Sequence, residues 1–330
     1  MASSIGIAVT GADASTSEEL MRNADIAMYS AKNEGKARCR VFESSMHSIV
    51  LERVALQSDL RHAIERSELE LHYQPVIELV TGRPLGFEAL VRWNHFERGM
   101  IQPLEFIGLA EETGLITPIG DWVLAEACRQ LVQWDDAGVT DGRFGISVNV
   151  SGRQVADADF VDTIARTLAA TELDPRRLTI ELTESTLLED AEATIAWLSL
   201  LKEVGIRLAL DDFGTGFSSL SYLRRLPVDC LKVDASFVRS INESGGGGEL
   251  ALAVVNLART LRLRTVAEGV EHAHQAEFLT RSGCRFGQGY HFSRPLPRGE
   301  IPAFIQGALL ALNGGDEQST GGEALTPELV

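Results

Sequence analysis

The sequence contains few cysteines and no long apolar run, and both shortages exclude classes of protein. Its four cysteines, Cys39, Cys128, Cys230 and Cys284, are widely separated and form no Cys-x-x-Cys pair. This pattern favours reduced thiols in a cytoplasmic protein over a disulfide framework or a zinc site. No apolar run approaches the roughly 18–20 residues that a membrane-spanning helix requires. We therefore expect a cytoplasmic location and no membrane contact by these residues.

The sequence is also poor in basic residues. Lys and Arg together number 30, against 47 Asp and Glu, so the formal net charge is −17. A surface this acidic is a poor partner for nucleic-acid polymers and for anionic lipid, because both require clustered positive charge. A small phosphate ligand stays compatible with this charge, since bound cations can reverse the electric field inside one cleft.

Strand-like and helical patterns alternate from about residue 69 onward. About eight strands alternating with helices predict one α/β domain, a (β/α)8 TIM-like barrel. The first two strands are joined by a short turn at 80–84, so we expect them to pair antiparallel. The expected strands are 69–75, 85–93, 144–150, 178–183, 206–212, 230–234, 265–269 and 284–289, and the main expected helices are 119–136, 157–171, 187–204, 250–262 and 272–281.

The two ends of the chain differ from this alternating region. Residues 1–45 contain one strand and one helix, which cannot bury a core by themselves, so we expect them to be part of another domain. Residues 310–330 are polar and rich in glycine, which is typical of a disordered tail. The barrel is therefore expected to occupy residues 46–309.

Carboxylates, amides and one lysine lie within or just after separate predicted strands. In a (β/α)8 barrel these strand ends meet at one mouth, where active sites of this fold lie. Crowded carboxylates are unfavourable unless a cation lies among them, and a set of ligands offering only oxygen suits magnesium or manganese. Adjacent Asp211 and Asp212 could serve two metals, an arrangement that recurs in phosphodiester cleavage. The residues are Glu88, Asn149, Glu181, Asp211, Asp212, Lys232, Asp234, Glu268 and Gln288.

Each of these residues also has an ordinary structural explanation. A single Glu on a strand is usually a half-exposed edge residue, and Asp-Asp before Phe-Gly can belong to a turn or a helix cap. Structural ion networks resemble sites in the same way. The hypothesis therefore depends on the whole set converging at one place.

Seven short motifs occur in order along the predicted barrel. They are Phe87-Glu-Ala-Leu-Val-Arg-Trp93, Asn149-Val-Ser151, Glu181-Leu-Thr-Glu184, Asp211-Asp-Phe-Gly-Thr-Gly-Phe-Ser-Ser-Leu220, Leu231-Lys-Val-Asp234, Ala267-Glu-Gly-Val-Glu271 and Gln288-Gly-Tyr290. Together, over about residues 50–309, they resemble the EAL-domain phosphodiesterases, which hydrolyse cyclic di-GMP to linear 5′-pGpG. Ser4-Ile-Gly-Ile-Ala8 and the segment 24–36 resemble the C-terminal end of a GGDEF domain. Because the GGDEF signature loop does not precede them here, we expect no cyclase activity.

The resemblance implies a role for each matching position. Two divalent cations, Mg²⁺ or Mn²⁺, would be held by Glu88, Asn149, Glu181, Asp211 and Asp212, with Asp211 shared between them. Lys232 would contact the attacking water or the phosphate, and Glu268 would support the water and metal network. Glu88, Asp212, Lys232 and Glu268 are thus the expected catalytic set.

The resemblance further implies substrate contacts and supporting residues. Gln74, Leu90, Arg92 and Gln288 would contact the substrate, while Asp234 and Glu271 would support the metal ligands. Glu184 would anchor the loop 212–220, which in this family links the metal site to a dimer interface, so a homodimer is expected. Two alternatives stay open: a cyclic di-GMP receptor without activity, and a magnesium-dependent barrel enzyme acting on a carboxylate substrate.

Overall fold

The computed structural model describes residues 3–10, 16–33, 37–184, 186, 191–214, 223–242, 244 and 246–315. The chain divides into two compact units, Met1–Arg66 and Ser67–Val330. The expected boundary after residue 45 falls at the first residue of the helix α2 (Ser45–Leu60), whereas the structure groups α2 with the first unit. Within the part of the chain that the structure describes, no helix has the length and apolar character needed to cross a membrane.

The first unit is a small α/β arrangement. Strands β1 (Ile5–Ile7) and β2 (Cys39–Val41) pair in parallel, and the helix α1 (Ser17–Asn33) connects them. A second helix, α2 (Ser45–Leu60), follows. Gly6 lies so close to α1 that a Cβ there would collide with the backbone at Ala24 and Met28. The strand β2 was not predicted, because Cys39-Arg-Val41 follows a basic stretch, whereas β1, which has the same length, lies in the apolar run 5–9.

The second unit is a closed barrel of eight strands, so the predicted fold is confirmed. The strand β3 pairs with both β4 and β11 and thereby closes the ring. It runs antiparallel to both neighbours, while all the other strand pairs within the ring are parallel. The antiparallel first pair is therefore confirmed. The strands are β3 (Leu69–Glu78), β4 (Pro84–His95), β6 (Gly145–Asn149), β7 (Leu178–Thr183), β8 (Arg207–Phe213), β9 (Cys230–Val233), β10 (Arg264–Ala267) and β11 (Phe286–Gly287).

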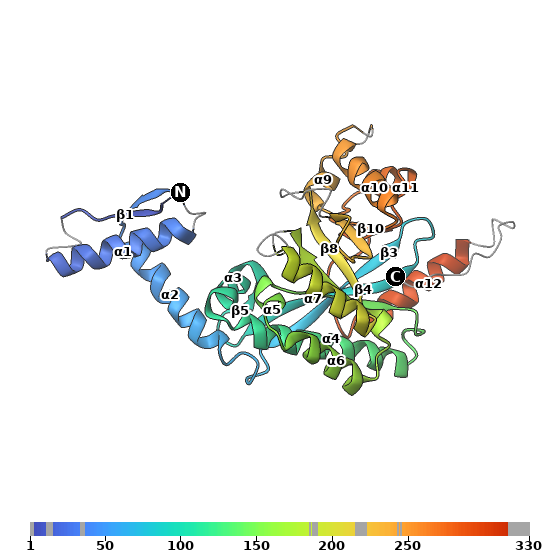
Figure 1. Ribbon diagram of the computed structural model, residues 1–330, viewed down its shortest axis with the longest axis horizontal. Coiled ribbons are helices and arrows are strands. Elements are labelled where there is room, and N and C mark those ends of the chain that lie inside the picture. The colour runs from blue at the N-terminus through green and yellow to red at the C-terminus, as the bar shows by residue number, and fades with distance from the viewer. Residues whose placement is uncertain are drawn as a thin grey trace. The chain divides into compact units, whose positions relative to one another are not determined.

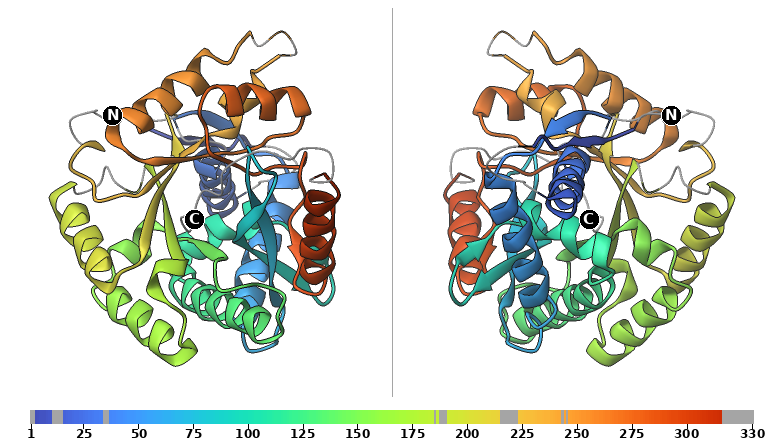
Figure 2. Two further views of the ribbon diagram at one scale, coloured as in Figure 1. Left: turned by 90° about the vertical axis from the view of Figure 1, so that its right-hand side faces the viewer. Right: turned by 90° about the vertical axis from the view of Figure 1, so that its left-hand side faces the viewer.

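Helices surround the barrel strands, as the green to red helices in Figure 2 show. They are α3 (Pro103–Thr113), α4 (Ile116–Asp136), α5 (Gly152–Val155), α6 (Phe160–Thr171), α7 (Ala191–Val204), α9 (Ala235–Arg239), α10 (Glu249–Leu261), α11 (Ala273–Arg281) and α12 (Ile301–Gly315), with a 3₁₀ turn at Pro175–Arg177. The five expected helices are all present, although residues 187–190 lie outside the described residues. The helix α12 continues to Gly315, which corrects the expectation that a disordered tail begins at residue 310.

Two short strands extend the ring. The strand β5 (Gly99–Ile101) pairs antiparallel with the end of β4, and β12 (Leu296–Pro297) pairs antiparallel with β3.

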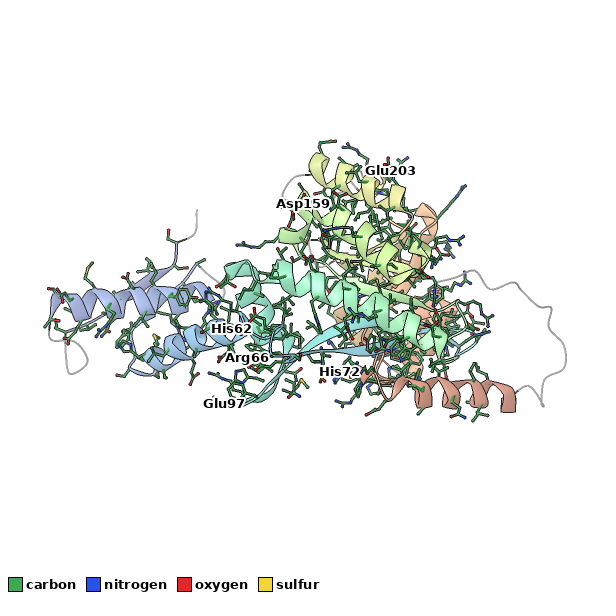
Figure 3. All side chains as sticks on the ribbon, turned by 90° about the horizontal axis from the view of Figure 1, so that it is seen from below. His62, Arg66, His72, Glu97, Asp159 and Glu203 are labelled. Carbon is green, nitrogen blue, oxygen red and sulfur yellow. The ribbon has the colours of Figure 1, made fainter. Side chains whose placement is uncertain are left out.

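Figure 3 labels residues on several of these elements. His72 lies on β3, Glu97 at the turn between β4 and β5, Asp159 before α6 and Glu203 near the end of α7.

An aromatic cluster fixes α4 against the strands that begin the barrel. The ring of Trp134, on α4, lies 4.7 Å from that of Tyr73 and 5.3 Å from that of Phe87. Phe144 stacks on Phe87 at 5.7 Å, and all four rings are buried. Edge-to-face and offset aromatic pairs of this kind stabilise a core beyond the apolar area they bury. The beginning of the barrel is thereby a rigid support for residues on β4 and β6.

Candidate functional site

Lys232, in β9, lies at the centre of a buried polar cluster inside the barrel. Its Nζ atom lies 2.5 Å from a carboxylate oxygen of Glu181 and 3.0 Å from one of Asp211. Carboxylate oxygens of Glu268 and Glu88 lie 2.7 Å and 3.5 Å from the same nitrogen. One cation thus faces four carboxylates that come from β4, β7, β8 and the end of β10. The structure therefore brings together residues separated by up to 180 positions in the sequence.

Glu88 is also held by two amide side chains. Its Oε1 accepts a hydrogen bond of 2.6 Å from Nδ2 of Asn149, and its Oε2 accepts one of 2.5 Å from Nε2 of Gln288. The carbonyl oxygen of the Gln288 amide is buried and has no hydrogen-bond partner among the described residues. Buried acceptors of this kind are costly unless a donor or a cation completes them. The cluster therefore offers an unused acceptor to a positive partner beyond Lys232.

The pKa values show the same excess of negative charge. Burial raises the pKa of Glu181 to about 8, with Glu88 and Asp211 adding to the rise and Lys232 opposing it. Burial also raises the pKa of Glu268 well above its usual range, again against the effect of Lys232. For Lys232, burial alone would lower the pKa, but the surrounding carboxylates outweigh it and raise the pKa well above its usual value. Lys232 therefore keeps its proton. Its single positive charge does not balance the negative charges of the surrounding carboxyl groups, so the pKa values of Glu181 and Glu268 stay raised.

Asp211 and Asp212 are adjacent in the sequence, and their carboxylate groups nevertheless lie on the same side of β8. Consecutive residues of a regular strand point to opposite faces. Asp212, however, has a left-handed backbone conformation with φ of 53°, and the register between β8 and β9 shifts between Leu210 and Phe213. One oxygen each of Asp211, Asp212 and Glu268 consequently lies within 4.8 Å of the others. Burial, followed by the charges of Asp211 and Asp234, raises the pKa of Asp212.

Two further acids tie this arrangement to neighbouring segments. Glu184, just after β7, is buried, and its Oε2 accepts a hydrogen bond of 3.0 Å from the backbone N–H of Gly214. Asp234 accepts a bond of 2.9 Å from the backbone N–H of Ser236 and so caps α9. The expected loop 212–220 is described only as far as Gly214, so its route beyond that residue lies outside the described residues.

The expected substrate residues line two clefts that share residues with the cluster. Leu90 and Arg92 line a cleft of about 300 Å³ that also reaches Asn149. Burial lowers the pKa of Arg92, although the charge of Glu88 partly restores it. The second cleft, about 450 Å³, is lined by residues on the side of β3, β10 and β11, among them Gln74, Glu268, Glu271 and Gln288.

Comparison with known proteins identifies the family. The family model described as "EAL domain" matches residues 57–295 of this chain. The chain belongs to the EAL domain family. A solved structure titled "PaMucR Phosphodiesterase, c-di-GMP complex" is 46% identical in sequence, with a TM-score of 0.71 over 75% of this chain and 99% of that one.

Two curated relatives also align with this EAL domain protein along most of its length. The bifunctional diguanylate cyclase/cyclic di-GMP phosphodiesterase MucR of Pseudomonas aeruginosa is 46% identical over 92% of this chain. The cyclic di-GMP phosphodiesterase PdeR of Escherichia coli is 41% identical over 89% of it. The chain spans 44% of the length of each of these two relatives.

The EAL domain contains a donor set that fits divalent metal ions. Its Asp211, Asp212 and Glu268 offer oxygen atoms close enough to share an ion, and Glu88 and Glu181 lie around the same lysine. Hard cations such as Mg²⁺ prefer carboxylate and amide oxygens. The crowding of four carboxylates around one ammonium group, with Asp212 beside them, and the unpartnered oxygen of Gln288 both fit an additional cation.

Sequence reasoning gave no role to Tyr290, which the structure places in the second cleft of the EAL domain. Tyr290 is 55% exposed, and the guanidinium carbon of Arg294 lies 4.6 Å from the centre of its ring. Arg239 lines the same cleft, although it comes from α9, more than forty residues earlier. The signal for Tyr290 was an aromatic residue two positions after Gln288, whereas nothing in the local sequence marks Arg239.

Proposed function

We propose that this EAL domain hydrolyses cyclic di-GMP to linear 5′-pGpG with the help of two divalent cations, Mg²⁺ or Mn²⁺. The observation that carries the proposal is the cluster of carboxylates and amides around one permanently charged lysine. The curated names of MucR and PdeR, both cyclic di-GMP phosphodiesterases, support it. In the reaction a water oxygen bonds to phosphorus, the bond from phosphorus to the 3′ oxygen breaks, and that oxygen takes up a proton.

The metal ligands we propose are Glu88, Asn149, Glu181, Asp211 and Asp212. When bound, divalent cations supply Lewis acidity, which neutralises the phosphate and lowers the pKa of water. Asp211 would be the ligand common to both ions, because one of its oxygens lies close to oxygens of Asp212 and Glu268.

Lys232 acts as a fixed positive charge rather than as a base. The surrounding carboxylates keep its pKa well above the usual value, so it holds its proton at neutral pH. It is therefore suited to stabilise the charge that develops on the phosphate in the transition state. Glu268, 2.7 Å from Lys232, positions that ammonium group and the attacking water.

The two clefts support a ligand with two similar halves. Cyclic di-GMP has two guanine bases and two phosphates. We propose that Leu90 and Arg92 contact one half, while Gln74 and Gln288 contact the other. Asp234, Glu184 and Glu271 keep the loops at the barrel mouth in place.

The test is incubation of the full chain with cyclic di-GMP and Mg²⁺, followed by separation of the linear dinucleotide. The test variant is Glu88→Ala, which removes a carboxylate of the cluster. Its matched control is Glu203→Ala, which removes an exposed carboxylate on α7 (Figure 3). Turnover by the unaltered chain and by Glu203→Ala, but not by Glu88→Ala, is the expected result. Binding of cyclic di-GMP without any product would instead support a receptor, and neither binding nor product would leave a barrel enzyme for another substrate.

Further proposals concern the chain around the barrel. We propose that residues 1–45 belong to a GGDEF domain, and that the protein is cytoplasmic. We also propose a homodimer formed through the barrel, because Glu184 holds Gly214 at the start of the segment expected to reach the interface. Light scattering with and without cyclic di-GMP tests the dimer.

A further inference from the structure

The second cleft contains a basic residue to which the proposed function gives no role. Nine described residues line this cleft of about 450 Å³, and Arg239 is the only basic one among them. The other two charged residues in its lining, Glu268 and Glu271, are acids. A volume of this size is typical of ligand sites, which measure roughly 300–1,000 Å³. A single arginine in an otherwise acidic lining therefore requires an explanation.

The guanidinium group of Arg239 is available to a ligand. Arg239 is exposed, and its side chain forms no hydrogen bond or ion pair within the described part of the chain. An arginine with a structural role, such as Arg177, instead bonds to a carboxylate, which for Arg177 is that of Asp135. The donors of Arg239 are thus free to meet acceptors that a ligand brings into the cleft.

The backbone that carries Arg239 is fixed on both sides. The carbonyl group of Val238, a fully buried residue, accepts a hydrogen bond of 3.1 Å from Nε2 of Gln275 on α11. The carbonyl oxygen of Ile241 lies 3.1 Å from Nε2 of His274, also on α11. Because α9 is held in this way, a ligand needs to order only the side chain of Arg239 when it binds.

Tyr290 supplies an aromatic surface to the same cleft. The N–H of His291 donates a bond of 2.9 Å to the carbonyl of Val270, and a Cβ at Gly289 would collide with the Val270 backbone. The segment that carries Tyr290 is thereby held in place. Arg294 lies over the ring, yet 55% of Tyr290 stays exposed. Nucleobases stack on aromatic side chains with little regard to their identity, so Tyr290 alone does not select a base.

We propose that Arg239 selects guanine in this cleft by donating paired hydrogen bonds to O6 and N7 of one base of cyclic di-GMP. A planar guanidinium group matches these two acceptors, and arginine is the commonest specific partner of this edge of guanine. Adenine carries an amino donor in place of O6, and this donor opposes the N–H groups of an arginine. Arg239 thus favours cyclic di-GMP over cyclic di-AMP. The inference rests on the proposed function, because it concerns the same ligand at the same barrel mouth.

The test compares the dissociation constants of cyclic di-GMP and cyclic di-AMP for the full chain, measured by calorimetry with Ca²⁺ in place of Mg²⁺. Arg239→Gln should weaken binding of cyclic di-GMP about tenfold or more, which corresponds to about 1.4 kcal/mol, and leave binding of cyclic di-AMP nearly unchanged. Arg239→Lys keeps the charge without the planar fork, so it should lose the preference as well. The matched control, Arg281→Gln, removes an exposed arginine of α11 and should keep the full preference.

Initial rates of 5′-pGpG release with Mg²⁺ separate this inference from the proposed function. In Arg239→Gln, KM should rise while kcat stays the same, because the residue contacts a base and not the reacting phosphate. Turnover by the unaltered chain together with an unchanged preference in Arg239→Gln would overturn the role of Arg239 and leave the proposed function intact.

Two other results would also overturn the inference. Full preference in Arg239→Lys, with loss in Arg239→Gln, would show that position 239 attracts phosphate by charge and does not recognise the base. Neither binding nor turnover of cyclic di-GMP by the unaltered chain would refute the proposed function and this inference together.

Discussion

Replacing Lys232 with Met removes the positive charge at the centre of the acidic cluster while retaining most of the side-chain volume. The ammonium group lies within 3.0 Å of carboxylate oxygens of Glu181, Asp211 and Glu268 and is almost fully buried. Removing one partner of a buried ion cluster typically destabilises a protein by about 3–5 kcal/mol, because the remaining charges stay buried and unpaired. We expect a loss of this order in metal-free protein.

Divalent metal should reduce this loss of stability. A cation bound among the same carboxylates replaces the missing positive charge, so Mg²⁺ should stabilise Lys232→Met more than it stabilises the unaltered chain. Urea unfolding with and without Mg²⁺ measures both differences. Equal stabilisation of the two proteins by Mg²⁺ would show that Lys232 and the metal do not share these carboxylates.

Turnover should fall by about 10²–10³-fold, as it does when one donor to a developing charge is removed. The loss should appear in kcat rather than in KM, because Lys232 acts on charge that develops only in the transition state. Initial rates of 5′-pGpG release at saturating and subsaturating cyclic di-GMP separate the two constants. A large rise in KM with unchanged kcat would refute this reasoning and make Lys232 a substrate-binding residue.

Four more outcomes follow from the same site. Glu88→Ala should abolish turnover and leave the far-ultraviolet circular dichroism unchanged; near-normal turnover by the folded variant would contradict its role as a ligand. Metal-free protein should lose stability as pH rises from about 4.5 to about 8, because folded Glu181 keeps a proton that the unfolded chain releases. Urea unfolding at several pH values measures how steeply the free energy of unfolding falls with pH, and Glu181→Gln should make this fall less steep. Calcium should support binding of cyclic di-GMP but little hydrolysis, since it takes more ligands at about 2.3–2.6 Å and lowers the pKa of water less than magnesium; equal turnover with both ions would argue against water activation by the metals. A chain that begins near Phe42 should keep its turnover, and complete loss in a folded protein would show that residues 1–41 take part in the chemistry.

The barrel could be predicted because its strands and helices alternate at regular spacing. The apolar runs of β7 and β8 have the composition of strands buried on both faces, and the short turn before Pro84 permits only an antiparallel pair. The short strand β1 lies in the apolar run 5–9, whereas the strands β12 and β2 could not be predicted, since Leu296-Pro297 and Cys39-Arg-Val41 lie in polar or basic stretches. Their pairing depends on neighbours that lie far away in the sequence.

The members of the acidic cluster could be predicted, whereas their arrangement could not. Polar residues within or just after the strands of a (β/α)8 barrel meet at its mouth, so Glu88, Glu181 and Asp211 could be grouped from position alone. That Lys232 contacts four carboxylates depends on the closure of the ring, which brings β4 within reach of β9. The left-handed backbone of Asp212 likewise depends on the register shift between β8 and β9.

The negative charge of the chain and of this site opposes the binding of the proposed substrate, which is itself negatively charged. The chain has a net charge of −17, and a cluster with five carboxylates and one lysine repels a ligand that carries two phosphates. Coulomb repulsion between groups a few ångströms apart is strong in a buried site, where water screens little. Lys232 alone cannot reverse this repulsion, because its charge is already shared among four carboxylates. Divalent cations at the cluster are therefore needed for the substrate to bind at all, before any water is activated. Removal of the metal ions should therefore raise KM as well as lower kcat. Removal of the Lys232 ammonium group, by contrast, is expected to lower kcat alone.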